Sequence, residues 1–262
     1  MAAALGMVPV WLVAVLVAAG VAAPATSART DSAMVEQAPA TTRTVFTGVR
    51  IGIDPGHNGR NYTAPRFINH LVWNGRQMEA CDTTGTQTNW GYTESRYTFA
   101  VARDLAALLR ASGATVTMTR HSNTGIGPCI DRRAQILDRS HAAVSIDIHA
   151  DGGPAGGRGF AVLEPVRDQV NRHVVGSSRA FGWMLRRAFL RTGMPTSSYD
   201  GRRGIALRSD LAGLNLTTMP KVLIECGNMR NRTDARMLTS GWFQHRAAAA
   251  IMDAMRAFLQ SR

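Results

Sequence analysis

Two kinds of hydrophobic pattern alternate along the chain after residue 45. Short apolar runs, typical of buried strands, occur in the segments VRIGID, ATVTMTR, AAVSIDIH, GRGFAVLE and KVLIEC. Between these runs, apolar residues three and four positions apart predict helices over residues 94–111, 131–140, 171–191 and 241–259. Alternating strands and helices indicate βαβ units. The sequence therefore predicts an α/β fold: a single domain with a mostly parallel central sheet of about six strands, flanked by helices.

The N-terminal part of the chain does not share this pattern. Residues 8–23, VPVWLVAVLVAAGVAA, are apolar and are followed by small residues, which is typical of a secretory signal peptide. We therefore predict a signal peptide over residues 1–28, a flexible leader over residues 29–44 and one folded domain over residues 45–262. An uncleaved membrane anchor is the alternative to cleavage. If cleavage occurs, the mature protein has no stable membrane span and is secreted to the periplasm or cell wall.

The interval from Arg60 to Tyr92 is longer than an ordinary connection between a strand and a helix. Long ordered loops tend to be functional, so we expect a hairpin or flap that lies over the site. Of the three cysteines, Cys81 and Cys129 lie in turn-like, glycine-rich stretches, whereas Cys226 follows a hydrophobic strand. An exported protein can hold a disulfide, and the predicted pair is Cys81 with Cys129; three free thiols are the alternative.

The formal net charge of +12 lies entirely after residue 28, and arginine supplies nearly all of the positive charge. A basic surface attracts polyanions, which here are nucleic acid, an anionic membrane or an acidic cell-wall polymer. Export argues against nucleic acid as a partner. The simpler interpretation of any single arginine is a solvated side chain on a basic surface.

Four acidic or imidazole side chains fall where predicted strands end or helices begin. His57 follows VRIGID, Glu94 begins the first long helix, His149 ends AAVSIDIH, and Glu225 ends the apolar part of KVLIEC. The carboxyl ends of parallel strands meet at one edge of a sheet. Zn²⁺ prefers imidazole and carboxylate ligands, and a hydrolytic site uses three of them. Taken singly, a histidine at a strand end is more often structural, and a glutamate at a helix start stabilises the helix dipole.

Three segments follow one another in an informative order: IDPGH at residues 53–57, SIDIHAD at 145–151 and PKVLIECG at 220–227. Together they resemble the zinc-dependent N-acetylmuramoyl-L-alanine amidases, and in particular the compact mycobacterial or actinobacterial members of the AmiC-type catalytic domain family. The resemblance covers residues 48–260. It implies a Zn²⁺ ion at the carboxyl edge of the strands, with metal ligands and a catalytic glutamate that map to His57, Glu94, His149 and Glu225, respectively.

The reaction implied by this resemblance is hydrolysis of the amide bond between N-acetylmuramic acid and L-alanine in peptidoglycan. Glu225 would transfer the proton, and the substrate would be peptidoglycan or a muropeptide, acted on by a monomer. Thr119, Arg120 and Arg133 match positions that shape the family's site. Three further arginines could contact the carboxylates of the stem peptide: Arg202, Arg203 and Arg208.

Some residues around the motifs depart from the family pattern. Asn58 replaces the usual glycine after DPGH, Asp147 stands where serine is common, and Asp151 replaces an asparagine. These changes leave the predicted ligands intact and bear on substrate preference. Two other functions remain open at this point: a catalytically silent wall-binding protein on the same fold, and a zinc peptidase that cuts within the stem peptide.

Overall fold

The computed structural model describes residues 45–262, so the predicted signal peptide and leader lie outside the described residues. A six-stranded sheet crosses the domain. Its strands, in their order across the sheet, are β4 (Thr115–Met118), β1 (Arg50–Pro55), β5 (Val144–Asp151), β8 (Lys221–Asn228), β6 (Ala161–Pro165) and β7 (Ile205–Arg208). The first four are parallel, whereas β6 runs antiparallel to β8 and parallel to β7. The predicted α/β fold with a mostly parallel six-stranded sheet is therefore confirmed.

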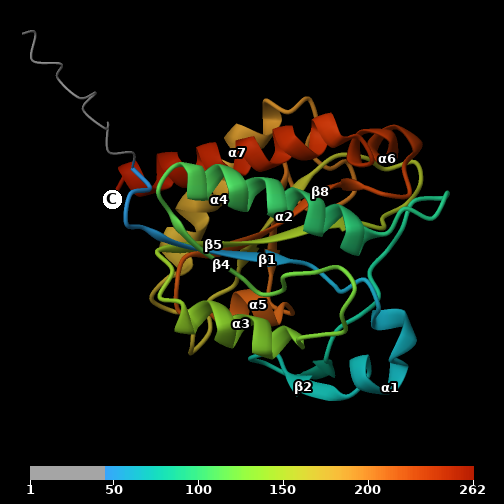
Figure 1. Cartoon of the computed structure of the whole chain (residues 1–262), viewed down its shortest axis with the longest axis horizontal. Coiled ribbons are helices and arrows are strands. Elements are labelled where there is room, and N and C mark those ends of the chain that lie inside the picture. Colours follow the sequence, from blue (N-terminus) through green and yellow to red (C-terminus); the bar gives the residue numbers. More distant parts are fainter. Residues whose placement is uncertain (1–44) are drawn as a thin grey trace, which may run out of the picture. The chain divides into compact units, whose positions relative to one another are not determined.

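Helices cover both faces of the sheet (Figure 1). One face carries α2 (Glu94–Ala111), α4 (Val175–Leu190) and α7 (Gly241–Gln260), and the other carries α3 (Ile130–Arg139) and α5 (Ala212–Asn215). A short helix, α6 (Arg232–Leu238), joins β8 to α7. No helix within residues 45–262 has both the length and the apolar composition needed to cross a membrane.

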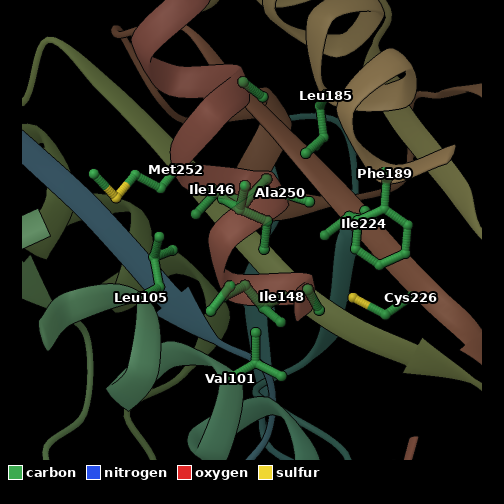
Figure 2. Packing of buried hydrophobic residues seen from close by; sticks show 14 of the residues in the cluster. Val101, Leu105, Ile146, Ile148, Leu185, Phe189, Ile224, Cys226, Ala250 and Met252 are labelled. Carbon is green, nitrogen blue, oxygen red and sulfur yellow. The ribbon is translucent and has the colours of Figure 1, made fainter. Parts of the chain in front are cut away.

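The main hydrophobic core lies between the sheet and the layer formed by α2, α4 and α7. Central strands of a sheet that is covered on both faces are buried on both faces, and β5 and β8 are buried along nearly their whole length. Figure 2 shows side chains of these strands packed against those of the helices: Ile146, Ile148 and Ile224 from the sheet, Val101 and Leu105 from α2, Leu185 and Phe189 from α4, and Ala250 from α7. This packing holds the strand ends, and hence the site, on a rigid support.

Two details of the sequence prediction need correction. The helix expected over 171–191 begins only at Val175, because the side chain of Asn171 donates hydrogen bonds to the carbonyls of Val166 and Leu214 and so fixes a turn there. The prediction did not locate β7, a four-residue strand with little apolar pattern of its own. The other three predicted helices agree with α2, α3 and α7 to within a residue at each end.

The long segment between β1 and α2 folds into a 3-10 turn (Asn61–Thr63), the short helix α1 (Pro65–Ile68) and an antiparallel hairpin of β2 (Leu71–Trp73) and β3 (Met78–Ala80). The turn of the hairpin forms hydrogen bonds with the loop after β7 and with the last residue of α5. Asn74 donates to the carbonyl of Asp210, and Asn215 donates to the carbonyl of Asn74. The segment is thus an ordered hairpin docked on the domain.

A disulfide joins Cys81, just after β3, to Cys129, just before α3, with Cα atoms 4.5 Å apart. It is the pair expected from the sequence, and it closes a loop of 48 residues that contains the end of the hairpin segment and all of α2. Cys226 is buried and free. The bridge therefore fixes the end of the hairpin segment against the start of α3.

Candidate metal centre

The chain path brings the predicted site residues to one edge of the sheet. From β1 the chain passes over one face to β4, and from β4 it returns over the other face to β5, on the opposite side of β1. Such a reversal opens a crevice at the carboxyl ends of the two central strands. His57 follows β1, His149 lies near the end of β5, and Glu225 of β8 is the register partner of His149.

The carboxylate of Glu94, the first residue of α2, lies between the two imidazoles. Its Oε2 is 3.2 Å from Nε2 of His57, and its Oε1 is 2.9 Å from Nδ1 of His149. The two rings meet edge to face, with centroids 4.9 Å apart. Among the described residues, His57, Glu94 and His149 each offer one donor atom within 4.8 Å of the others, a spacing that one metal ion can bridge.

The backbone around these side chains is shaped to let them meet. His57 has a φ of 58°, a left-handed conformation that turns its ring back over the strand end. Gly56 cannot be replaced without a clash, because a Cβ there would lie 2.3 Å from the ring of His149. At Gly85, a Cβ would lie 2.6 Å from the ring of His57 and 2.8 Å from Oε2 of Glu94. The absence of side chains at these two glycines leaves the space that the donor groups and a small ligand need.

The charges of the groups around this space favour the binding of a cation. Burial lowers the pKa of His57, but Glu94 and Asp82 outweigh that effect and raise it to about 10. Burial raises the pKa of Glu225 well above its usual range, and Glu94 and Asp151 raise it further. The Oε2 atom of Glu225 is buried and has no hydrogen-bond partner among the described residues. Two imidazoles and a carboxylate are a donor set that suits Zn²⁺, so the residues present fit this metal.

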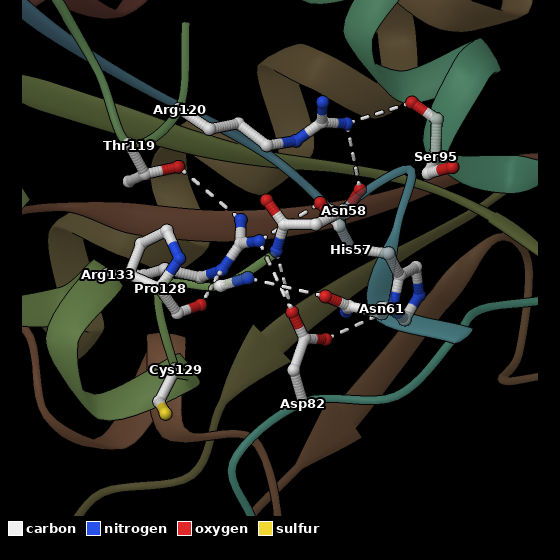
Figure 3. A network of polar contacts seen from close by, with 12 residues as sticks. His57, Asn58, Asn61, Asp82, Ser95, Thr119, Arg120, Pro128, Cys129 and Arg133 are labelled. Carbon is white, nitrogen blue, oxygen red and sulfur yellow. Dashed lines mark hydrogen bonds and ion pairs between the residues drawn. The ribbon is translucent and has the colours of Figure 1, made fainter. Parts of the chain in front are cut away.

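Asp82 holds the other side of the His57 ring (Figure 3). Its Oδ1 lies 3.3 Å from Nδ1 of His57, and its Oδ2 accepts hydrogen bonds from Asn58 and Arg133. A carboxylate on Nδ1 keeps the proton there and leaves Nε2, the atom that faces Glu94, free to bind a metal. Sequence reasoning missed Asp82. Its one signal was an acidic residue next to Cys81 in the unusually long segment.

Arg133 of α3 connects this aspartate to the turn that carries His57. Its guanidinium donates to the carboxylate of Asp54 at 2.6 Å and to the carbonyl of His57 at 3.0 Å. Thr119 also donates to Asp54, and Arg120 donates to the carbonyls on either side of the β1 end, Pro55 and Gly56. These three residues hold the loop in place, which is the shaping role expected of Thr119, Arg120 and Arg133.

Replacing Asp82 by asparagine should lower zinc affinity by about 10- to 100-fold, because the amide no longer fixes the proton on Nδ1 of His57. Competition with a chromogenic chelator measures this affinity directly. The matched control is Asp104→Asn on α2, whose partly exposed carboxylate forms an ion pair with His245 and with no other described residue. Unchanged affinity in the Asp82 variant would mean that Asp82 does not orient His57.

The other candidates from the sequence lie outside the His57–Glu94–His149 group. Arg208 is held by Asp210 through two contacts of 2.7 and 2.6 Å, and Arg202 and Arg203 are exposed. His70 lies 3.7 Å from Sγ of Cys129, beside the disulfide. Asp147 is buried and forms an ion pair with Lys221 at 2.7 Å, so its departure from the family pattern is matched by a buried cation.

A family model described as N-acetylmuramoyl-L-alanine amidase matches residues 51–257. The chain belongs to this family. An N-acetylmuramoyl-L-alanine amidase of Mycobacterium tuberculosis is 36% identical over 218 residues, which cover 83% of this chain and 89% of the relative. The chain with the sequence above is therefore a hydrolase of cell-wall peptidoglycan. A probable cell wall amidase, LytH, of Staphylococcus saprophyticus is 26% identical over 79% of this chain and 57% of its own length.

Solved structures of amidases show the same fold. The amidase Ami1 of Mycobacterium smegmatis matches with a TM-score of 0.78 and 36% identity, over 83% of this chain and 99% of that one. Ami1 of Mycobacterium abscessus, in its apo form, matches with a TM-score of 0.76 and 38% identity, over 81% and 99% of the two chains. Both are similar to this chain over nearly all of the described domain.

Proposed function

We propose that this amidase depends on zinc, that His57, Glu94 and His149 bind the ion, and that Glu225 transfers the proton. The reaction is hydrolysis of the amide bond between N-acetylmuramic acid and L-alanine. The observation that carries the proposal is the carboxylate of Glu94 between two imidazoles, at 3.2 and 2.9 Å, beside the buried and unpartnered Oε2 of Glu225.

A bound Zn²⁺ supplies Lewis acidity towards the amide carbonyl and lowers the pKa of water. The protein's own residues do the rest. Glu225, beside His149 in the register of the sheet, accepts the proton of the attacking water and delivers it to the alanine nitrogen. Its Oε2 forms no hydrogen bond with another described residue, so this oxygen is free to accept the proton. Asp82 and Arg133 keep His57 oriented throughout.

The cellular setting of the proposal follows from the N-terminal sequence and the family. Residues 1–28 serve as a signal peptide, residues 29–44 as a leader and residues 45–262 as the amidase domain, which acts as a monomer outside the cytoplasm. The substrate is peptidoglycan or a muropeptide, and nucleic acid is not a partner. The disulfide between Cys81 and Cys129 is consistent with an oxidising compartment.

Digestion of purified muropeptides should release free stem peptides together with sugars that lack a peptide. Mass spectrometry of the products measures this outcome. Shortened stems would instead identify a peptidase, and an unchanged digest would identify a wall-binding protein without activity. Zinc removal by a chelator should stop the release of stems, and added Zn²⁺ should restore it.

A further inference from the structure

Two cavities of the described domain adjoin the metal centre. One, of about 430 Å³, is lined by His57 and His149 and by residues of β3 and α5. The other, of about 510 Å³, meets the centre at Gly85, where an added Cβ would lie 2.6 Å from the ring of His57 and 2.8 Å from Oε2 of Glu94. A substrate amide bond held at the metal extends from it in two directions, towards the sugar and towards the stem peptide. The two cavities offer a separate space to each of these parts.

The walls of the two cavities differ in charge. Five carboxylates line the 430 Å³ cavity, and four of them form ion pairs with cations of the protein, so that this wall has no cation left for an anionic ligand. The 510 Å³ cavity is lined by hydroxyl, amide and backbone groups and, among the described residues, by one charged side chain, that of Arg230 in the loop after β8. We call it the Arg230 cavity. An anionic part of the substrate is therefore favoured there.

The side chain of Arg230 has no partner within the described domain, although its backbone is held firmly. The guanidinium forms no hydrogen bond or ion pair with any described residue. The side chain of Asn228 accepts from the N–H of Arg230 and donates to two carbonyls of the loop after β5, those of residues 154 and 157. The N–H of Met229 donates to the carbonyl of Asp151 at 2.7 Å. A cation on a loop fixed in this way binds an anion at a small cost in conformational entropy.

A buried amide adds a hydrogen-bond acceptor to the same cavity. Asn58 is 3% exposed and lines the Arg230 cavity. Its Nδ2 donates to Oδ2 of Asp82 at 3.0 Å, which fixes the direction of the side chain (Figure 3). Its Oδ1 accepts no hydrogen bond from any described residue, so an N–H group of a bound peptide can donate to it. The cavity thus presents an acceptor for a peptide N–H together with a cation.

We propose that the Arg230 cavity binds the stem peptide beyond L-alanine, and that Arg230 binds the α-carboxylate of the D-glutamate in the second position. The inference rests on the proposed amidase function. The sugars of a muropeptide are neutral and the lactyl carboxyl is part of the scissile amide, so the negative charge lies on the stem. The second residue is linked onward through its γ-carboxyl, and its α-carboxylate stays charged unless it is amidated to D-isoglutamine. The enzyme therefore prefers stems with D-glutamate.

Two synthetic substrates test this subsite: N-acetylmuramoyl-L-Ala-γ-D-Glu-L-Lys and its counterpart with D-isoGln, which differ only by a carboxylate and a carboxamide. In the wild-type enzyme, kcat/KM for the carboxylate substrate should exceed that for the carboxamide substrate by about tenfold, the size of one charge-assisted hydrogen bond. Arg230→Gln should bring this ratio close to one by slowing the carboxylate substrate alone. Arg236→Gln removes an exposed arginine of α6 that does not line the cavity, and it should keep the ratio.

The possible failures are distinct. A ratio near one in the wild type, or a tenfold ratio that persists in Arg230→Gln, overturns the subsite while the amidase function stands. Failure to cut either substrate contradicts the amidase function instead. The subsite is then judged by calorimetry with the peptides L-Ala-γ-D-Glu-L-Lys and L-Ala-D-isoGln-L-Lys, since binding needs no turnover. Weaker binding of the amidated peptide, with the difference lost in Arg230→Gln, would support it, and equal affinities in the wild type would overturn it.

Discussion

Replacing Glu225 by glutamine should lower kcat by about a thousandfold, while zinc content and melting temperature stay at their wild-type values. Glutamine has the shape of glutamate but cannot accept a proton from water at neutral pH. The Oε2 atom of Glu225 is buried without a partner, so the substitution breaks no hydrogen bond at that atom. Steady-state kinetics on a muropeptide, with metal analysis of the same preparation, measure both quantities.

The matched control for this substitution is Glu164→Gln. Glu164 is a buried glutamate on a strand of the same sheet, and its Oε1, like Oε2 of Glu225, lacks a hydrogen-bond partner among the described residues. It is outside the metal centre, so its variant should keep full turnover. Wild-type kcat in the Glu225 variant would show that another group transfers the proton, and loss of zinc would show that Glu225 is a ligand.

Replacing His149 by alanine should remove the metal and reduce activity below detection. The change leaves two of the three donors that lie within 4.8 Å of one another, and two protein ligands do not hold zinc tightly. Zinc per chain should fall from about one to near zero after dialysis, and the stabilisation that zinc gives to the folded state should disappear with it. Elemental analysis and melting curves with and without zinc measure these effects.

His121→Ala provides the control for the histidine variant. His121 lies two residues after Thr119, just beyond the carboxyl end of β4, but it is exposed and belongs to no group of metal donors among the described residues. Its variant should bind zinc as the wild type does. A His149 variant that retains one tightly bound zinc per chain would place the metal elsewhere.

The fold was predictable because its elements have strong local signals. The apolar runs of β1, β5 and β8 and the long helical patterns of α2 and α7 give the order of the elements, and the order gives the α/β class. His57, Glu94 and His149 were predictable as a group because each occurs at an element end. Parallel strands bring such ends to one edge of the sheet.

Other features depend on contacts between residues far apart in the sequence. The partnership of Asp82 with His57 spans 25 residues and requires the whole hairpin segment to fold back on the strand end. The antiparallel direction of β6 is set by its pairing with β8, and the short strand β7 by its pairing with β6, rather than by local pattern. The cavity beside His57 and His149 is lined by residues from four strands and two helices and from the loops between them, so no single segment could reveal it.

The Asp147–Lys221 pair shows why the surroundings of a site are harder to predict than its ligands. Asp147 alone looked like a departure from the family pattern. The register of β5 and β8 pairs Lys221 with Ser145, two residues before Asp147, and the Nζ atom of Lys221 lies 2.7 Å from Oδ1 of Asp147. A buried charge and its partner must be read together, since removing either one leaves the other unpaired.

Anomalous diffraction at the zinc edge, from crystals grown with one equivalent of Zn²⁺, tests the central claim most directly. One peak is predicted within bonding distance of His57, Glu94 and His149, at about 2.0–2.2 Å from each donor atom. A peak beside His70, or none at saturating zinc, would contradict the assignment of these three residues as the metal centre.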